Sequence, residues 1–266
     1  MNGAQLIPWW GLVGAAALIA VNGGLSVWLQ LGLERKLLIA SVRTVVQLLA
    51  LGFVLVPVFR ANSMVLVLAW GLAMVVLASW EATRRTRRRY RGMFMHAFVA
   101  MFLGATLTSV LGVAVLIGVE PWWQPRYFIP ILGMILGNTL TGVALGMDRS
   151  TTILDESRGR VEAMLAFGAT RWEALRPVAT ESLRTGMVPI LNAMSVVGLV
   201  TIPGMMTGQL LGGSSPQIAA RYQILIMFLV AATIAMATAT VVILGLYRMI
   251  DRQHRLRVDL LKIDGV

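Results

Sequence analysis

The feature of this sequence that most limits its fold is a series of long, almost uninterrupted apolar blocks. Runs of about 17 to 25 apolar residues need lipid rather than water as their solvent. The 266-residue chain is 58% apolar and 13% charged, whereas soluble domains are about 45 to 50% apolar and about 25% charged. We therefore expect an all-α integral membrane protein, and the composition excludes an ordinary soluble globular domain.

The lengths of these blocks predict about seven membrane-spanning helices. They are expected at residues 6–31, 37–59, 63–80, 93–118, 127–147, 187–211 and 222–247. The first block is longer than the apolar core of a secretory signal and has no basic residue before it. We interpret it as a retained membrane anchor.

The basic residues indicate how the chain is oriented. Arginines cluster at residues 84–91, recur between residues 149 and 184 and continue in the tail, whereas the opposite loops hold only Arg60, Arg126 and Arg221. Because basic loops remain in the cytoplasm, we expect the N-terminus outside, the C-terminus inside and a place in the inner (plasma) membrane. Tryptophans at positions 9, 10, 122 and 123 then fall at the outer interface, which aromatic rings prefer.

The net charge of +11 is thus interpreted as a consequence of topology, and we expect lipid contact but no nucleic-acid partner. The arginine cluster at 84–91 is interpreted as a topology anchor in preference to a patch for anionic lipid.

One long polar segment, residues 148–186, interrupts the apolar pattern and predicts a cytoplasmic helical hairpin. Gly168 suits the left-handed residue that ends a helix, and Thr170 with Glu173 matches the capping box that begins the next. Pro177 is expected to end or kink that second helix. A pair of surface helices without a partner explains the pattern equally well. The apolar positions at helical spacing are Val161, Met164, Leu165, Trp172 and Leu175.

The chain therefore divides into four parts by sequence. Transmembrane helices occupy residues 1–147, the cytoplasmic hairpin 148–186, further transmembrane helices 187–247 and a basic cytoplasmic tail 248–266.

Several catalytic and metal chemistries are excluded by composition. Cysteine is absent, and with only two histidines, His96 and His254, a zinc site of the usual kind cannot be built. A phosphate-binding P-loop needs Lys followed by Ser or Thr, but Lys36 and Lys262 are followed by apolar residues. The chain is therefore not expected to be an enzyme or to hydrolyse ATP itself.

Two sets of motifs resemble known transport proteins. Residues 162–168 read EAMLAFG and are followed by ATRW, which resembles the EAA loop of ABC transporter permeases; the Leu-Pro that ends that signature is missing. The strings IPILGMILGN at 129–138, VGLVTIPGMMTGQ at 197–209 and RYQI at 221–224, with Arg43, Gln47 and Gly52, resemble the FetB (YbbM) family of iron-export ABC permeases. This second resemblance covers nearly the whole chain.

The resemblance implies a permease subunit of an ABC transporter that exports iron or a metal-related substrate. It also implies a homodimer that works with two copies of a separate ABC ATPase, which binds ATP and Mg, so that no cofactor is expected in this chain. The residues implied to couple to the ATPase are Glu162, Ala163, Gly168, Ala169, Thr170, Arg171 and Trp172.

Polar and helix-breaking residues inside the apolar blocks are candidates for a substrate pathway. Pro203 and Gly204 predict a break or re-entrant turn at residues 202–208, because irregular backbone at membrane depth must be buried or line a cavity. Arg43 shares a helix face with Gln47 and could equally extend to the cytoplasmic surface. Methionines could bind soft metals, but with 16 in the chain we favour apolar packing. The pathway candidates are Arg43, Gln47, Asn138, Asn192, Pro203, Gly204, Met205, Met206 and Gln209.

The acidic residues lie outside or at the edges of the expected spans, which leaves the metal ligands and the substrate undefined. Their position disfavours an ion-coupled secondary transporter, since such carriers commonly use a buried acid or internal repeats. A membrane scaffold that only recruits a cytoplasmic partner is the other alternative. Three GxxxG pairs, at 133 and 137, 142 and 146, and 208 and 212, permit close helix contacts without specifying any.

Overall fold

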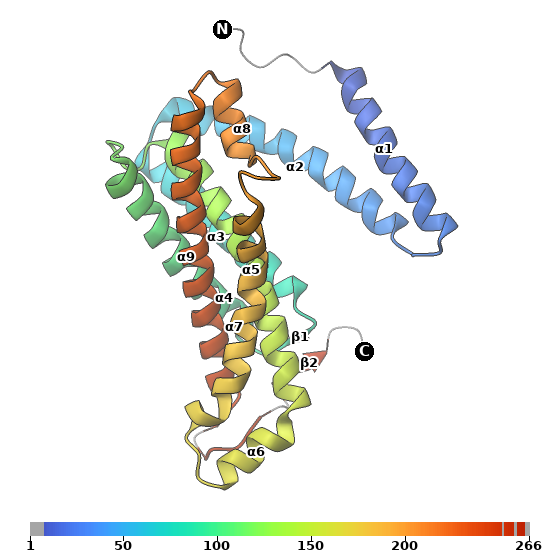
Figure 1. Ribbon diagram of the computed structural model, residues 1–266, viewed down its shortest axis with the longest axis vertical. Helices are drawn as coiled ribbons and strands as arrows, with labels where there is room; N and C mark the ends of the chain where they lie inside the picture. The colour runs from blue at the N-terminus through green and yellow to red at the C-terminus, as the bar shows by residue number, and fades with distance from the viewer. Residues whose placement is uncertain (1–7, 252, 258–259, 264–266) are drawn as a thin grey trace.

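The protein is a bundle of long helices from which one helical hairpin projects (Figure 1). The structure, a computed structural model, describes residues 8–251, 253–257 and 260–263. Residue 6 at the start of the first expected span, and Arg252, Asp259 and Asp264 of the tail, lie outside the described residues.

The helices follow the apolar blocks of the sequence. They are α1 (Trp9–Trp28), α2 (Glu34–Ala61), α3 (Met64–Arg85), α4 (Met93–Val110) continued by the π-helical segment η1 (Leu111–Ile117), α5 (Pro125–Glu156), α6 (Arg158–Ala166), α7 (Arg171–Val196), α8 (Gly204–Leu211) and α9 (Pro216–Arg248). Two short strands, β1 (Arg88–Arg89) and β2 (Lys262–Ile263), pair antiparallel.

Six helical stretches among the described residues are long and apolar enough to cross a membrane: α1, α2, α3, α4 with η1, α5 and α9. The expectation of a multi-pass, all-α membrane protein is confirmed, but the count of seven spans is not. The expected span at 187–211 is divided, because α7 ends at Val196 and α8 begins only at Gly204.

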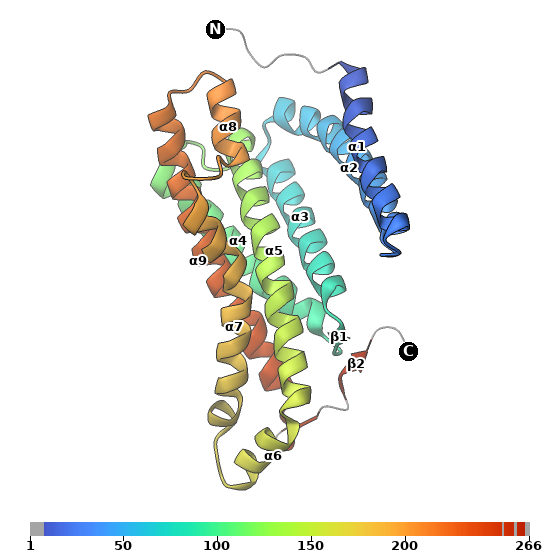
Figure 2. The ribbon, with the colours of Figure 1, turned by 45° about the vertical axis from the view of Figure 1, so that its right-hand side comes forward.

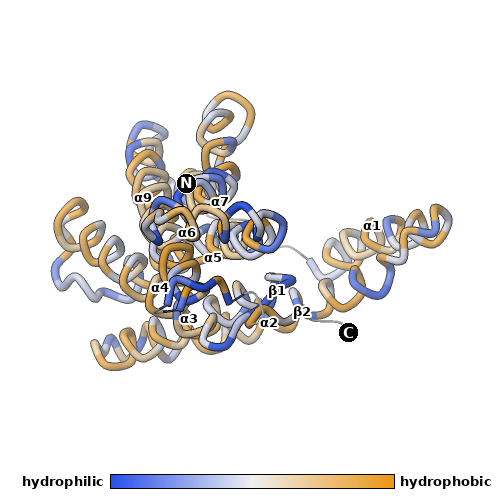
Figure 3. The backbone as a smooth tube through the Cα atoms, turned by 90° about the horizontal axis from the view of Figure 1, so that it is seen from below, coloured by the Kyte–Doolittle hydropathy of each residue, from blue (hydrophilic) through white to orange (hydrophobic). Residues whose placement is uncertain are grey.

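The ends of the bundle differ in character. The loop that carries β1, the short helix α6 and the C-terminal tail all lie at one end, while the α8–α9 turn lies at the other (Figure 1). Seen from the α6 end, backbone near β1 and α6 is hydrophilic and the helices behind it are mostly hydrophobic (Figure 3). This segregation matches the predicted sorting of basic segments to one side of a membrane.

Helix α5 lies at the centre of the bundle and packs on α3, α4, α7 and α9. Its closest contacts use glycine: a Cβ placed on Gly142 would lie 2.6 Å from Ile234 Cγ2 of α9 and 3.0 Å from the Gly186 carbonyl oxygen of α7. Gly146 and Gly186 approach Thr238 of α9 equally closely. We call Gly142, Gly146, Gly186 and Thr238 the glycine hub, since it joins α5, α7 and α9.

Helices α1 and α2 form a projecting arm that leans away from the bundle (Figures 1 and 2). Helix α1 packs on α2, and α2 meets the bundle at a few positions on α3 and α5. The most apolar stretch of α2 has no buried residue. The arm therefore packs little on the rest of the described chain.

Candidate functional site

The candidate coupling site is the turn between α6 and α7. Helix α6 ends where Gly168 takes a positive φ of 88°, with its N–H donated to the Leu165 carbonyl, so the predicted left-handed glycine is confirmed. Thr170 then caps α7: its N–H donates to Glu173 Oε2 at 2.7 Å, and Glu173 N–H donates back to Thr170 Oγ1 at 3.3 Å. The predicted capping box is present and satisfies the backbone N–H groups of Thr170 and Glu173 at the start of α7.

The capping box also perturbs Glu173. Hydrogen bonds donated by the Thr170 side chain and then by its backbone N–H stabilise the carboxylate, so the pKa of Glu173 is lowered. The box is therefore complete at neutral pH, where the carboxylate is charged.

The outer side of the turn is apolar and exposed. Phe167 is 93% exposed and Trp172 is 42% exposed, while space around Gly168 is open. On the inner side Val161 and Leu175 are buried. Phe167 was not among the predicted coupling residues. It lies off the helix face that Val161 and Leu165 share, and this position is the sequence signal that could have identified it as an exposed aromatic residue.

The expected hairpin at residues 148–186 has no helix end at either of its boundaries. The expected boundaries between residues 147 and 148 and between 186 and 187 fall inside continuous helices, because α5 runs to Glu156 and α7 runs from Arg171 to Val196. Pro177 lies within α7 and does not end it. Helix α7 therefore joins the α6–α7 turn directly to the bundle without a linker.

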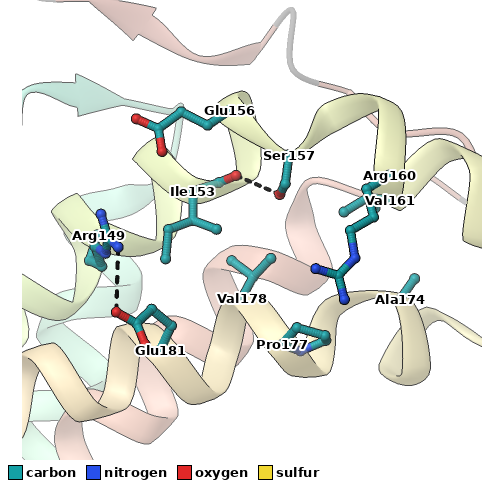
Figure 4. A pocket seen from close by; sticks show the side chains of 10 residues that line it. All are labelled: Arg149, Ile153, Glu156, Ser157, Arg160, Val161, Ala174, Pro177, Val178 and Glu181. Atoms are coloured by element: carbon teal, nitrogen blue, oxygen red, sulfur yellow. Dashed lines mark hydrogen bonds and ion pairs between the residues drawn. The ribbon is translucent and has the colours of Figure 1, made fainter.

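A cavity of about 290 Å³ separates α6 from the junction of α5 and α7 (Figure 4). At one end Arg149 of α5 pairs with Glu181 of α7 at 3.4 Å, and at the other the guanidinium of Arg160 lies beside Pro177 (Figure 4). Ile153 and Val178 line the space between them. Val161 of α6 and Ala174 of α7 also line the cavity and are both buried, so α6 remains packed on α7 beside it.

Other residues that were predicted to couple also lie at the surface. Glu162 accepts from Arg158 Nε at 2.9 Å within α6, and Ala163 is exposed. A second hollow of about 460 Å³ lies between α6 and tail residues 253–256. The tail turn is organised by Asp251, whose carboxylate accepts the N–H groups of Arg255 and Gln253; the bond from Arg255 contributes most to lowering the Asp251 pKa.

The arginine cluster at 84–91 is partly structural. Arg88 pairs with Asp155 of α5 at 2.9 Å and donates to Thr152, and the backbone N–H of Arg87 donates to Asp148. The guanidinium of Arg84 stacks 4.7 Å from the ring centre of Trp80. Several of these arginines therefore fix the loop to α3 and α5 in addition to any role in topology.

The pathway candidates do not converge on one site. Arg43 pairs with Glu81 at 3.5 Å, Gln47 is exposed on α2, Asn138 donates to its own helix at Met134, and Asn192 is exposed on α7. Within the described residues, no hydrogen bond or ion pair joins any two of the nine side chains. Only the candidates between Pro203 and Gln209 lie close together, because they belong to α8 or directly precede it.

The predicted break at residues 202–208 is misplaced. Residues 197–203 are non-helical, Gly198 has a φ of 81°, and Gly204 begins α8. Met205 and Met206 are half-buried on α8, and the side-chain oxygen of Gln209 is buried without a hydrogen-bond partner. Among the described residues no group of three or more His, Asp or Glu could hold a metal ion.

Comparison with known proteins identifies the family. A family model described as "Uncharacterised protein family (UPF0014)" matches residues 9–250. The chain belongs to UPF0014.

Relatives of this UPF0014 protein come from bacteria and plants. A UPF0014 membrane protein of Synechocystis is 36% identical over 247 residues and covers 92% of each chain. The probable iron export permease protein FetB of Escherichia coli is 31% identical over 88% of each chain, in accord with the family resemblance of the sequence. Protein ALUMINUM SENSITIVE 3 of Arabidopsis thaliana is 36% identical over 85% of this chain and 83% of its own. No solved structure matches the chain.

Proposed function

We propose that this UPF0014 protein is the permease subunit of an ABC transporter in the inner membrane and is driven by a separate ATPase. The observation that carries the proposal is the rigid, exposed turn of Phe167 and Gly168 at the head of a helix that continues into the membrane. A bare aromatic beside a small residue can enter a cleft of another protein, and aromatic anchors dominate interface energies.

The continuity of α7 supports transmission from that turn. Arg171 and Gly186 belong to one helix, and the carbonyl oxygen of Gly186 would lie 3.0 Å from a Cβ on Gly142 in α5. A displacement of the turn therefore reaches the centre of the bundle through one continuous helix rather than through a flexible loop. ATP and Mg belong to the partner, and we expect two ATPase copies with two copies of this chain.

The proposed substrate is iron or a metal-related compound, and its proposed direction is export. Both rest on the name of the Escherichia coli relative. The described residues contribute no cluster of acids or histidines for a bare ion, so we propose that the substrate crosses without a multidentate site built by carboxylates of this chain.

The test is purification of the chain with a candidate ABC ATPase, followed by ATP turnover measurements in lipid nanodiscs. Phe167→Ala should lower recovery of the complex and ATP turnover together, whereas Phe228→Ala, which removes an exposed ring from the middle of α9, should leave both unchanged. Normal assembly of Phe167→Ala contradicts the proposed anchor. Uptake driven by an ion gradient without ATP contradicts the ABC mechanism and favours a secondary transporter.

A further inference from the structure

The exposed side of the central helix α5 is unlike the rest of the bundle surface. At membrane depth α4 and α9 expose large apolar side chains, as contact with lipid requires. These are Phe102, Leu103, Leu107, Ile224, Phe228 and Met236. Between Pro130 and Leu145, by contrast, the exposed residues of α5 are Gly137 and Asn138, and Thr141 beside them is half-buried. This strip of α5 is therefore small and polar.

Helix α7 continues the polar side of α5. The two helices lie side by side and run in opposite directions (Figure 2). At their inner ends Arg149 of α5 pairs with Glu181 of α7 at 3.4 Å. Asn138 precedes Arg149 by three helical turns, and Asn192 follows Glu181 by three. Whole turns preserve the helix face, so the two exposed asparagines lie level on the side of the α5–α7 pair that carries this ion pair.

The two sides of α7 beyond the glycine hub differ in the same sense. Thr185 lies two turns before Asn192 and Ser195 one turn after it, so the three share a helix face on which Val188 is the apolar exception. The neighbouring face is apolar and consists of Met187, Leu191 and Met194. We call Asn138, Thr141, Thr185, Asn192 and Ser195 the oxygen face.

The hydrogen bonds of the oxygen face leave mostly acceptors turned outward. Asn138 donates from its amide nitrogen to the Met134 carbonyl at 2.8 Å, which leaves Oδ1. Thr185 and Ser195 donate their hydroxyl hydrogens to carbonyls four residues earlier in α7, at 3.0 and 2.8 Å, which leaves oxygen lone pairs. Pro189 has no N–H, so the Thr185 carbonyl also lacks its usual helix partner.

Of the possible neighbours of such a face, water and cations suit it best. Lipid offers no donor to these oxygen atoms, and polar residues at membrane depth usually face a bundle interior or a water-filled cavity. Oxygen acceptors bind hard cations and the water around them. An anion needs donors or unpaired positive charge, but Arg149, the cation on this side, is already paired with Glu181.

We propose that the oxygen face is the wall of a water-filled passage along which a hydrated cation crosses the membrane. This passage rests on the proposed function, in which ATP drives the movement and the second copy supplies the opposite wall. Neutral amide, hydroxyl and carbonyl oxygen atoms then take the place of carboxylates, which the described residues do not gather into a cluster.

The absence of native cysteine allows the passage to be mapped with one introduced thiol at a time. Asn192→Cys and Thr141→Cys are treated, in right-side-out and inside-out vesicles, with cationic and anionic methanethiosulfonates that do not cross membranes. A thiol reacts as the thiolate, which forms in water and not in lipid, so both variants should be labelled. Leu107→Cys is the control and should stay unlabelled. Leu107 is 64% exposed on α4 and stands beside Thr108, whose bond to Thr233 of α9 places it near the depth of the glycine hub.

The cationic reagent should label the two oxygen-face thiols severalfold faster than the anionic one, after each rate is divided by that for 2-mercaptoethanol. Three results overturn the proposal. If both thiols stay unlabelled, with and without ATPase and ATP, yet react fully after denaturation, the face meets lipid or protein. If Leu107→Cys is labelled as fast, labelling does not report a passage. If the anionic reagent is as fast or faster, the passage does not select cations. Recovery of the ATPase with wild-type and Phe167→Ala chains is measured separately, so the proposed function is judged on its own result.

Discussion

Replacement of a single glycine in the hub should destabilise the bundle far more than the same replacement one and a half turns away. Gly142→Ala adds a Cβ 2.6 Å from Ile234 Cγ2 and 3.0 Å from a backbone oxygen of α7, whereas a Cβ on Gly137 of the same helix meets nothing within 4 Å. The Ile234 side chain can rotate, but the backbone oxygen moves only if α7 separates from α5.

The expected size follows from overpacking, which costs about 1 to 3 kcal/mol, offset by up to about 1 kcal/mol of better helix propensity for Ala. With the full offset, Gly142→Ala should lose up to about 2 kcal/mol and Gly137→Ala should gain up to about 1 kcal/mol, so the two variants should differ by about 1 to 3 kcal/mol. At about 2 to 4 °C per kcal/mol for a chain of this size, the hub variant should melt a few degrees lower.

Thermal unfolding followed by size-exclusion chromatography in one detergent measures the difference between the two variants. Gly186→Ala should resemble Gly142→Ala, since its Cβ would lie 2.8 Å from the Gly142 carbonyl oxygen. The double variant should be less destabilised than the sum, because both changes relieve the same contact by separating α5 from α7. Equal stability of Gly142→Ala and Gly137→Ala would refute the hub as a constraint.

Three further predictions concern local hydrogen bonds. Thr170→Ala should cost about 1 kcal/mol of helix stability and weaken ATPase binding, measured by pull-down beside the wild-type chain. Because the pKa of Glu173 is lowered in the folded turn, the stabilisation by the box is present at neutral pH and lost as pH falls through that lowered value. The protection factors of the amides at the start of α7, in which the intrinsic pH dependence of exchange cancels, should therefore fall on acidification in wild type but not in Glu173→Gln. The 2.7 Å bond between Thr108 and Thr233 should give a coupling of about 0.6 kcal/mol in a double-mutant cycle with Val.

The α6–α7 turn could be predicted from sequence because its determinants are local. Gly168, Thr170 and Glu173 lie within six positions, and each contact joins neighbours in the chain. Helix ends of this kind are set by side chains within one turn, so the pattern is sufficient. The position of Phe167 off the helical spacing of Val161 and Leu165 is likewise a local signal, although it was not used in the prediction.

The prediction placed the helix break too late in the chain because proline can either interrupt a helix or stand just before one. Pro203 was interpreted as the interruption, but it stands immediately before α8, where its fixed φ and missing N–H are tolerated. The true end of α7 comes before Gly198, and the prolines within α7, Pro177 and Pro189, do not end it. Whether a proline ends a helix, lies within it or precedes it depends here on how α7 packs against α5 and α9. The sequence around each proline carries no information on that packing.

The GxxxG pairs differ in the same way. Gly142 and Gly146 face α7 and α9 at distances that no side chain could occupy. Gly208 has open space around it, and Gly212 approaches only the backbone of its own helix, α8. Identical spacing therefore supports a helix contact in one place and none in the other. The difference depends on which helices pack against the glycines. Those helices lie about forty to a hundred residues away in the sequence.

The glycine hub restricts how the proposed coupling can work. Its contacts fix the middle of α7, with Pro177 between the hub and the turn and Pro189 between the hub and the break. Each proline removes one backbone hydrogen bond, so bending of α7 concentrates at these two positions. A pull on the turn therefore has one of two results. Either α7 bends at Pro177 and the movement ends at that residue, or α5, α7 and α9 move together. Only the second transmits work into the membrane, and the moving body then includes the break at residues 197–203.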